Sequence, residues 1–422
     1  MRVFKFGGAS VKDAEGVRNV VSILGQFTGE KLVVIVSAMG KTTNALEAVV
    51  NAYISGDGLW QELLSDVRNF HLAIINELGF ENEHPVRNEV ARIFVEMEWV
   101  AEEPPSKGYN WAYDQIVSQG ELISTSIVSH YLNLKGIGNN LLDVRDVLVT
   151  DNTYREGKVD WNLSGRLIPE RIHELHKKNT IVVTQGFIGT TSENFTTTLG
   201  REGSDYTAAI FSFCLDAEEM VVWKDVPGIL SADPKFYDDA IKLEQISYRD
   251  AIELTYYGAT VIHPKTIKPL ENKRIPLRVA SFLSPKEKGT QVGDFQYTKP
   301  LVPCFIFKTS QILFSISSTD FSFIAEEHLS DIFALFAKHR VKINMMQNSA
   351  ISFSACTDND PMKIKGLVED LTKKFKVLYN ENLRLVTIRH YYTSTLENLT
   401  KGKTVLLEQR SRHTAQLVIR ED

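Results

Sequence analysis

Short apolar runs alternate with helical stretches over the first 290 residues of this 422-residue chain. Residues 3–6, 32–36, 180–184 and 220–223 are mostly apolar and rich in Val and Ile. Runs of this kind are typical of parallel strands whose two faces are both buried. The stretches between them have the residue spacing of helices. Repeated strand–helix units predict a three-layer α/β domain, with helices on both faces of one sheet.

Two glycine-bearing loops lie nearly two hundred residues apart, at 5–10 and 200–205. Each lies between a predicted strand and a predicted helix, where free backbone N–H groups and the helix dipole favour a bound anion. Lys5 adds a fixed cation to the first loop, and Arg201 adds one to the second. Together the loops predict a phosphoryl-transfer site built from two halves of one domain.

The alternation of single strands and helices ends at a stretch rich in Pro, Lys and Gly, which predicts a linker. The elements that follow are strands at 312–317, 341–346, 351–356 and 383–388, with helices at 323–339 and 362–375. The order β-α-β-β-α-β is that of the ferredoxin-like unit. Two further strand candidates, at 404–408 and 416–419, follow only a short turn-like stretch, which is too little for a second complete unit. We therefore divide the chain into domains at 1–290 and 306–422, with a linker at 291–305.

Composition excludes several classes of protein. The net charge of −6 gives no sign of a nucleic-acid-binding surface. Three scattered cysteines, Cys214, Cys304 and Cys356, fit a reducing compartment rather than a disulfide framework or a metal cluster. No apolar run approaches the roughly 20 residues that span a bilayer, and the start of the chain has no signal-peptide core. We expect a cytoplasmic protein that binds neither membrane nor nucleic acid.

Six short motifs occur along the chain. They are KFGGASV (5–11), VSAMGKTTN (36–44), SQGE (118–121), GREGSDYTAA (200–209), KDVPGILSADPK (224–235) and YGATVIHP (257–264). Any one of them is a weak match, because short glycine patterns arise often. In this order, and followed by a unit similar to the regulatory ACT domain, they resemble the aspartate kinases, a branch of the amino acid kinase family. The resemblance covers almost the whole chain.

The resemblance implies transfer of the γ-phosphate of ATP, with Mg²⁺, to the β-carboxylate of L-aspartate. The product is 4-phospho-L-aspartate, in the first step of lysine, threonine and methionine biosynthesis. The acceptor is a carboxylate with a reference pKa of about 3.9, so no proton has to be removed at neutral pH. Catalysis would come from alignment and charge neutralisation. The family also implies a homodimer or larger assembly through the ACT region.

The expected catalytic residues are Lys5, Gly7, Gly8 and Asp205. A lysine beside two glycines can approach a transferring phosphoryl group and neutralise its charge. By resemblance, substrate is bound by Thr43, Glu121, Arg201 and Ser204. A guanidinium can grip a carboxylate through two parallel hydrogen bonds, and a glutamate complements an α-ammonium. Asp205 and Ser204 are alternatively no more than helix caps.

The 224–235 segment follows a strand and carries turn residues, where α/β proteins usually bind nucleotides. By resemblance, the nucleotide contacts are Lys224, Asp225, Leu230, Lys235, Thr260 and Val261. Lys224, Leu230, Lys235 and Thr260 differ from the residues usual in bacterial lysine-sensitive members. His263, next to Pro264, is either a general base or the opening of a helix. We interpret it as structural, because the chemistry needs no base.

The C-terminal unit is expected to bind an amino-acid effector around Asn344, Asn348 and Ser349, with Asn344 replacing an aspartate often found there. Two other functions stay open. One is another amino acid kinase, acting on glutamate or acetylglutamate. The other is a catalytically silent amino-acid sensor. A panel of substrates would distinguish another amino acid kinase from an aspartate kinase. A measurement of ATP binding would distinguish the silent sensor, since such a sensor need not bind nucleotide.

Overall fold

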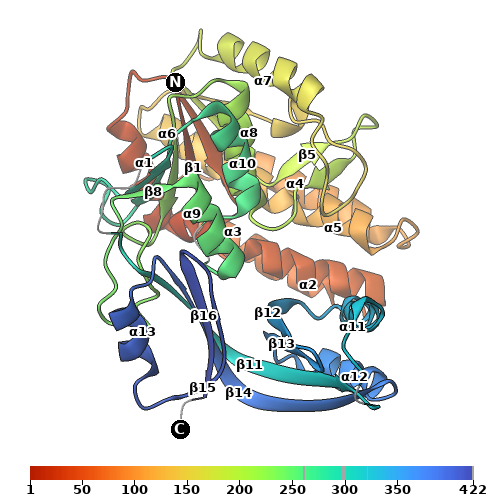
Figure 1. Cartoon of the computed structure of the whole chain (residues 1–422). Coiled ribbons are helices and arrows are strands. Elements are labelled where there is room, and N and C mark those ends of the chain that lie inside the picture. Colours follow the sequence, from red (N-terminus) through yellow and green to blue (C-terminus); the bar gives the residue numbers. More distant parts are fainter. Residues whose placement is uncertain (260–261, 296–300, 321, 421–422) are drawn as a thin grey trace. The chain divides into compact units, whose positions relative to one another are not determined.

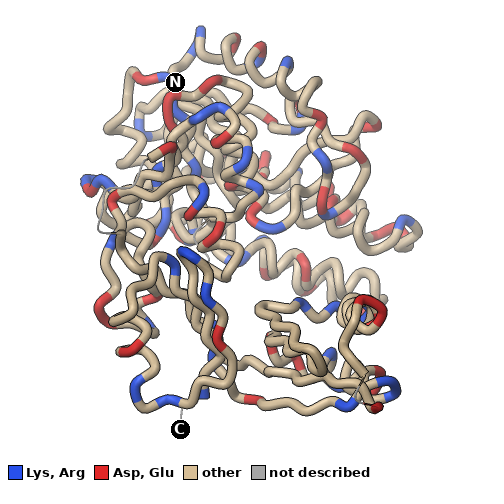
Figure 2. Tube along the Cα trace, viewed as in Figure 1, with Lys and Arg blue, Asp and Glu red and all other residues tan. Residues whose placement is uncertain are grey.

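The computed structural model describes residues 1–259, 262–295, 301–320 and 322–420 (Figure 1). The chain forms two compact units. The first contains residues 1–229, 243–252 and 262–295, and the second contains residues 230–242 and 253–259 together with the described residues from 301 onward. None of the helices in these described ranges has the length and apolar character that crossing a membrane requires. Acidic and basic residues are interspersed along the trace (Figure 2).

The first unit is built on an eight-stranded sheet (Figure 1). Its spatial order is β3 (Asn139–Leu142), β4 (Ile181–Gln185), β2 (Leu32–Val36), β1 (Arg2–Phe6), β7 (Glu219–Lys224), β9 (Leu277–Ser281), β10 (Thr290–Gly293) and β8 (Gln245–Ser247). The six strands from β3 to β9 run parallel, whereas β10 is antiparallel to β9. A small hairpin pairs β5 (Ile188–Thr190) with β6 (Thr196–Thr198).

Helices cover this sheet on both faces. The helices in this part of the chain are α1 (Ala14–Gly25), α2 (Thr42–Ser55), α3 (Trp60–Glu77), α4 (Pro85–Glu102), α5 (Tyr109–Val117), α6 (Gln119–Leu134), α7 (Trp161–Leu175), α8 (Gly203–Cys214), α9 (Tyr248–Tyr257), which belongs to the second unit from residue 253 on, and α10 (Pro264–Lys273). Helix α6 packs on β2, β3 and β4, and α8 packs on β1, β2 and β7. Every residue of β2 and β4 is buried, as the apolar runs predicted. The three-layer α/β prediction is confirmed.

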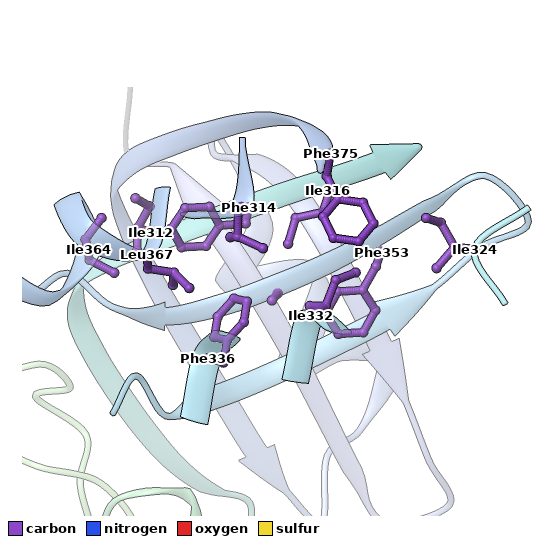
Figure 3. Close-up of a cluster of buried hydrophobic side chains, with 12 residues drawn as sticks. Ile312, Phe314, Ile316, Ile324, Ile332, Phe336, Phe353, Ile364, Leu367 and Phe375 are labelled. Atoms are coloured by element: carbon purple, nitrogen blue, oxygen red, sulfur yellow. The ribbon is translucent and has the colours of Figure 1, made fainter. Parts of the chain in front are cut away.

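The second unit contains a six-stranded antiparallel sheet (Figure 1). Its order is β12 (Ile343–Asn348), β13 (Ser352–Asp358), β11 (Cys304–Ser318), β14 (Phe375–Arg389), β16 (Thr414–Arg420) and β15 (Thr404–Arg410). Helices α11 (Glu326–Lys338) and α12 (Pro361–Leu371) pack on one half of it. Ile332 and Phe336 of α11 and Leu367 of α12 meet Phe314 and Phe353 there (Figure 3). The predicted β-α-β-β-α-β order is confirmed in this half.

The other half of the sheet extends the two long strands past a register shift between Lys308 and Gln311 of β11. The turn-like stretch predicted before 404 is wrong, because α13 (Thr393–Thr400) lies there. The core of this half contains Phe305, Val386 and Ile388, and residues from 230–242 pack into it. Tyr237 stacks on Phe305 with ring centroids 4.6 Å apart. This half therefore takes part of its core from a segment far earlier in the chain.

The predicted linker at 291–305 differs from the observed structure in two places. Most of β10 lies inside it, and β11 begins at Cys304. Strand β10 is four residues long, and pairing with β8 and β9 rather than a local apolar run defines it. The predicted first domain, 1–290, also includes segments 230–242 and 253–259, which belong to the second unit.

Candidate active site

The strand order reverses at β1, because the next strand along the chain, β2, lies on one side of it and the much later β7 lies on the other. In open α/β sheets, ligands bind beyond the carboxyl ends of strands at such a point. Lys5 lies near that end of β1, and the η1 turn (Gly8–Val11) follows. A Cβ on Gly8 would lie 2.7 Å from the carbonyl oxygen of Ala38. Only glycine allows the loops after β1 and β2 to approach this closely.

An ion cluster joins the two predicted glycine loops. The Nζ of Lys5 lies 2.7 Å from Oδ1 of Asp205, and the Nζ of Lys224 lies 3.7 Å from Oδ2. The Asp205 side chain is almost wholly buried. Burial alone would raise the pKa of this carboxyl, but Lys5 and Lys224 outweigh burial and hold the pKa below its ordinary value. Two ammonium groups around one carboxylate leave an excess of positive charge here.

Glu121, in the first turn of α6, is also buried. The Oε1 atom accepts a hydrogen bond from the backbone N–H of Ala38 at 3.3 Å. Among the described residues, Oε2 has no hydrogen-bond partner. Burial raises the pKa of Glu121 from 4.5 to about 8, against opposing effects that include the charge of Lys5. An unpaired carboxylate oxygen in this position is suited to a cationic ligand group.

A cavity of about 900 Å³ brings most of the predicted site together. The predicted residues that line it are Lys5, Gly8, Thr43, Glu121, Arg201, Ser204, Asp205 and Lys224. Cationic groups and a buried carboxylate thus face one space. The cavity can hold an anion and an ammonium group at the same time.

The second glycine loop shapes one wall of this cavity. Gly200 has φ of 75° and Glu202 has φ of 53°, both in the left-handed region. Glu202 is the residue before α8, and its side chain makes no capping hydrogen bond. Ser204 and Asp205 lie inside the first turn of the helix, and both line the cavity. The exposed Arg201 side chain lines it too and pairs with no carboxylate among the described residues.

A model of the amino acid kinase family matches residues 1–281. Lysine-sensitive aspartokinase 3 of Escherichia coli (strain K12) is 30% identical over 394 residues, which cover 92% of this chain and 86% of that protein. The chain belongs to the amino acid kinase family, in its aspartokinase branch. Aspartokinase 2, chloroplastic, of Arabidopsis thaliana is 28% identical over 429 residues, covering 96% of this chain and 75% of that protein.

Solved aspartokinase structures share the fold of the chain. E. coli aspartokinase III in complex with lysine and aspartate (T-state) has a TM-score of 0.87 and 27% identity, covering 99% of this chain and 95% of that one. The same enzyme in complex with aspartate and ADP (R-state) has a TM-score of 0.79 and 26% identity, covering 100% of this chain and 96% of that one. The similarity extends over both compact units.

Other residues that were predicted for the site of this amino acid kinase are not among those that line the cavity. Gly7 does not line the cavity, although a Cβ there would come within 3.1 Å of the Nζ of Lys5. Asp225 follows β7, is exposed and does not line the cavity. Leu230 and Lys235 belong to the second unit, where the backbone N–H of Lys235 donates to Asp233. Thr260 and Val261 lie outside the described residues.

The predicted effector residues lie on β12 and the turn after it. Asn344 is in a polar network: its Oδ1 accepts a 2.8 Å hydrogen bond from the Nζ of Lys308, and its Nδ2 donates to Gln311 and Asp358. Asn348 ends β12 and is exposed. The hydroxyl of Ser349 lies 2.8 Å from that of Ser352. The side chain of Asn344 is thus already engaged inside the unit.

His263 opens a helix, as predicted. Its Nδ1 accepts a hydrogen bond from the backbone N–H of Lys265 at 3.2 Å, and Pro264 is the first residue of α10. Over the described ranges, no group of three His, Cys, Asp or Glu side chains is placed to hold a metal ion.

A second arginine, Arg155, lies in the cavity wall, and no motif in the sequence indicates it. Arg155 has φ of 70°, which is unusual for a residue other than glycine. Its guanidinium lies 4.3 Å from the ring centroid of Tyr113 and 3.5 Å from a carboxylate oxygen of Glu47. Its backbone N–H donates to Asp114 at 2.9 Å.

Asp114 is a second residue that sequence reasoning missed. Besides the N–H of Arg155, its carboxylate accepts hydrogen bonds from the backbone N–H and the hydroxyl of Thr198, at 2.9 and 2.7 Å. Burial raises the pKa of Asp114 to about 6, although these three donors oppose the rise. Arg155 and Thr198 both line the cavity, so the hydrogen bonds to Asp114 connect two parts of the cavity wall.

Proposed function

We propose that this protein is an aspartate kinase, which transfers the γ-phosphate of ATP to the β-carboxylate of L-aspartate. One observation carries the proposal: Lys5 and Lys224 line the same cavity as Glu121 and Arg201. The first pair is suited to phosphate groups, and the second pair is suited to the two charged groups of an α-amino acid.

Substrate binding follows from the charges on the cavity wall. Glu121 would receive the α-ammonium of aspartate at its unpaired Oε2. Arg201 would bind a carboxylate through parallel hydrogen bonds, which a planar guanidinium provides. The hydroxyl groups of Thr43 and Ser204 supply further hydrogen bonds from the wall. The β-carboxylate is then held as an ionised nucleophile, and no general base is required.

Lys5 would stabilise the transferring phosphoryl group, because its ammonium is fixed and largely buried. Asp205 positions that ammonium and the ammonium of Lys224. In a water-poor site, fixed charges of this kind stabilise developing negative charge without reorganising during the reaction. Phosphoryl transfer needs little beyond such stabilisation and in-line placement of acceptor and donor.

ATP is the proposed donor, and one solved relative contains ADP together with aspartate. For the nucleotide we propose Lys224 and Asp225, with Leu230, Lys235, Thr260 and Val261 carried over from the family resemblance. Mg²⁺ usually binds proteins through one or two carboxylates plus substrate phosphates. Asp205 is already paired with Lys5 and Lys224, so the phosphates of ATP would hold the ion, which would neutralise their charge.

A hydroxylamine trap tests the proposal. Full-length protein with ATP, Mg²⁺ and L-aspartate should form aspartyl hydroxamate, because hydroxylamine captures acyl phosphates. L-Glutamate and N-acetylglutamate in place of aspartate give the control for other amino acid kinases. Hydroxamate from glutamate alone would assign a different acceptor. No hydroxamate, together with no ATP binding by calorimetry, would indicate an amino-acid sensor without turnover.

For the second unit we propose dimerisation and an amino-acid effector site around Asn344, Asn348 and Ser349. The relative from E. coli is named for its sensitivity to lysine. In this chain Lys308 already donates to Asn344, so an effector ammonium at that side chain would compete with an internal one. Adding lysine or threonine to the hydroxamate assay, with light scattering for subunit number, tests both parts.

A further inference from the structure

A second cavity, of about 500 Å³, lies among α7, α8 and α10 of the first unit. It shares no lining residue with the candidate active site. Its lining includes Trp161, Tyr206, Phe213, Lys265, Lys268 and Asn272. Its volume falls within the range of roughly 300–1,000 Å³ that is common for small-molecule sites.

Three aromatic rings form the apolar part of this cavity. Trp161 is the first residue of α7 and meets Phe213 edge to face, with ring centroids 5.3 Å apart. It meets Tyr206 in the same manner at 6.4 Å. Trp161 nevertheless remains 38% exposed. Part of a large indole surface is therefore available to a planar ligand.

Two lysines from α10 supply the positive part. The Nζ of Lys265 lies 4.6 Å from the Tyr206 ring centroid and donates to the carbonyl of Leu199 at 3.0 Å. Lys268 follows three residues later, on the same face of the helix. It is exposed and pairs with no carboxylate in the part of the chain that the structure describes. Lys273, farther along, is already paired with Asp216.

We propose that this cavity binds a small aromatic anion. Its ring would lie against Trp161, Tyr206 and Phe213, and its anionic group would lie at Lys265 and Lys268. The aromatic walls favour a planar apolar body, and the lysines favour negative charge over a neutral polar group. Asn272 adds an amide that can donate to the same anionic group.

Anilinonaphthalene sulfonate is a suitable probe, because it joins aromatic rings to one anionic group and fluoresces when bound. The full chain should bind it with one dominant site. Trp161→Ala should weaken binding about tenfold or more, and Lys268→Gln about threefold to tenfold. Lys178→Gln, an exposed lysine beyond the end of α7, is the matched control and should leave binding unchanged.

Competition distinguishes an anion site from a merely apolar patch. Benzoate should displace the probe, and benzamide, which has a similar ring without the charge, should displace it far less. Equal binding by wild type, Trp161→Ala and Lys268→Gln would overturn the proposal. Equal displacement by benzamide would also overturn it. Light scattering covers the remaining case: if Trp161→Ala dissociates an oligomer, a second copy of the chain is the occupant and the small-ligand proposal is wrong.

Discussion

The ammonium of Lys5, on the first strand, lies 2.7 Å from the carboxylate of Asp205, in the first turn of α8. This pair joins the two glycine loops that lie far apart in the sequence. Because the Asp205 side chain is almost wholly buried, the pair holds the lysine in one place. A fixed cation is what a phosphoryl-transfer site requires.

Replacing Lys5 with methionine should lower kcat by about 10²–10³-fold, since one preorganised charge is lost from the transition state. The KM for aspartate should change much less, because Glu121 and Arg201 remain. Steady-state kinetics with the purified full chain measures both. A variant with wild-type kcat would show that Lys5 lies outside the reaction path.

Glu121→Gln should change stability in a pH-dependent way. The pKa of Glu121 is about 8 in the folded protein against an ordinary value of 4.5, so the folded state holds the proton more tightly than the unfolded chain. Its stabilising contribution is complete below about 4.5 and is lost as pH rises through about 8. The variant lacks this titration, so it should melt above wild type at pH 9 and close to wild type at pH 4.5.

The same variant should bind aspartate more weakly, and the difference from wild type should grow as pH rises toward about 8, because ionised Glu121 pairs with an ammonium group and the amide does not. Thermal unfolding and the KM for aspartate are the two measurements. If the melting temperatures of the two proteins differ by the same amount at pH 4.5 and 9, Glu121 does not titrate as the structure indicates.

Asp114→Ala should raise the KM for aspartate and lower stability by roughly 1–3 kcal/mol. It leaves the backbone N–H groups of Arg155 and Thr198 without their acceptor. Asp66→Ala removes an exposed carboxylate from α3 and serves as the control. Indistinguishable urea-unfolding curves and kinetics for the two variants would exclude a positioning role for Asp114.

Gly8→Ala should destabilise the first unit by roughly 1–3 kcal/mol, because the added Cβ would meet backbone carbonyl oxygens of Ala38 and Gly40 at 2.7 and 2.9 Å. Gly165, inside α7, is the matched control. A Cβ there meets nothing within 4 Å, so Gly165→Ala should stabilise by about 0.5–1 kcal/mol. Opposite signs in urea unfolding confirm the close approach at Gly8, and equal effects contradict it.

Tyr237→Ala should destabilise the second unit by roughly 1–3 kcal/mol, because its ring stacks on Phe305 and packs against the core of that half of the sheet. Phe323→Ala removes an aromatic ring that is 71% exposed and should have little effect. Unfolding followed by circular dichroism compares the two. An unchanged transition in Tyr237→Ala would mean that segment 230–242 adds little to this core.

The sequence predicted features that depend on local pattern. The fully buried strands β2 and β4 were visible as apolar runs, and the loop at Gly8 was visible as a glycine pair. Features that depend on tertiary contacts were not predictable. Strand β10 exists through pairing with β8 and β9, and nothing in the turn residues around Tyr237 indicates that it packs on Phe305.

The residues of the candidate site also divide into those that sequence motifs indicate and those that only tertiary contacts bring to the cavity. Lys5, Glu121, Arg201 and Asp205 were found through motif resemblance, and one cavity brings them together. Arg155 was not predicted, because no glycine marks its left-handed backbone conformation. The hydrogen bond from its backbone N–H to Asp114 holds that conformation instead. Predicted residues outside the first unit, such as Lys235, remain proposals.

The most direct test of the central claim is ADP release from MgATP by the full chain, with and without L-aspartate. We predict release that depends on aspartate, is not supported by glutamate, and is strongly reduced in both Lys5→Met and Arg201→Ala. Aspartate-dependent release that is unchanged in these two variants would contradict a reaction in the cavity that Lys5 and Arg201 share.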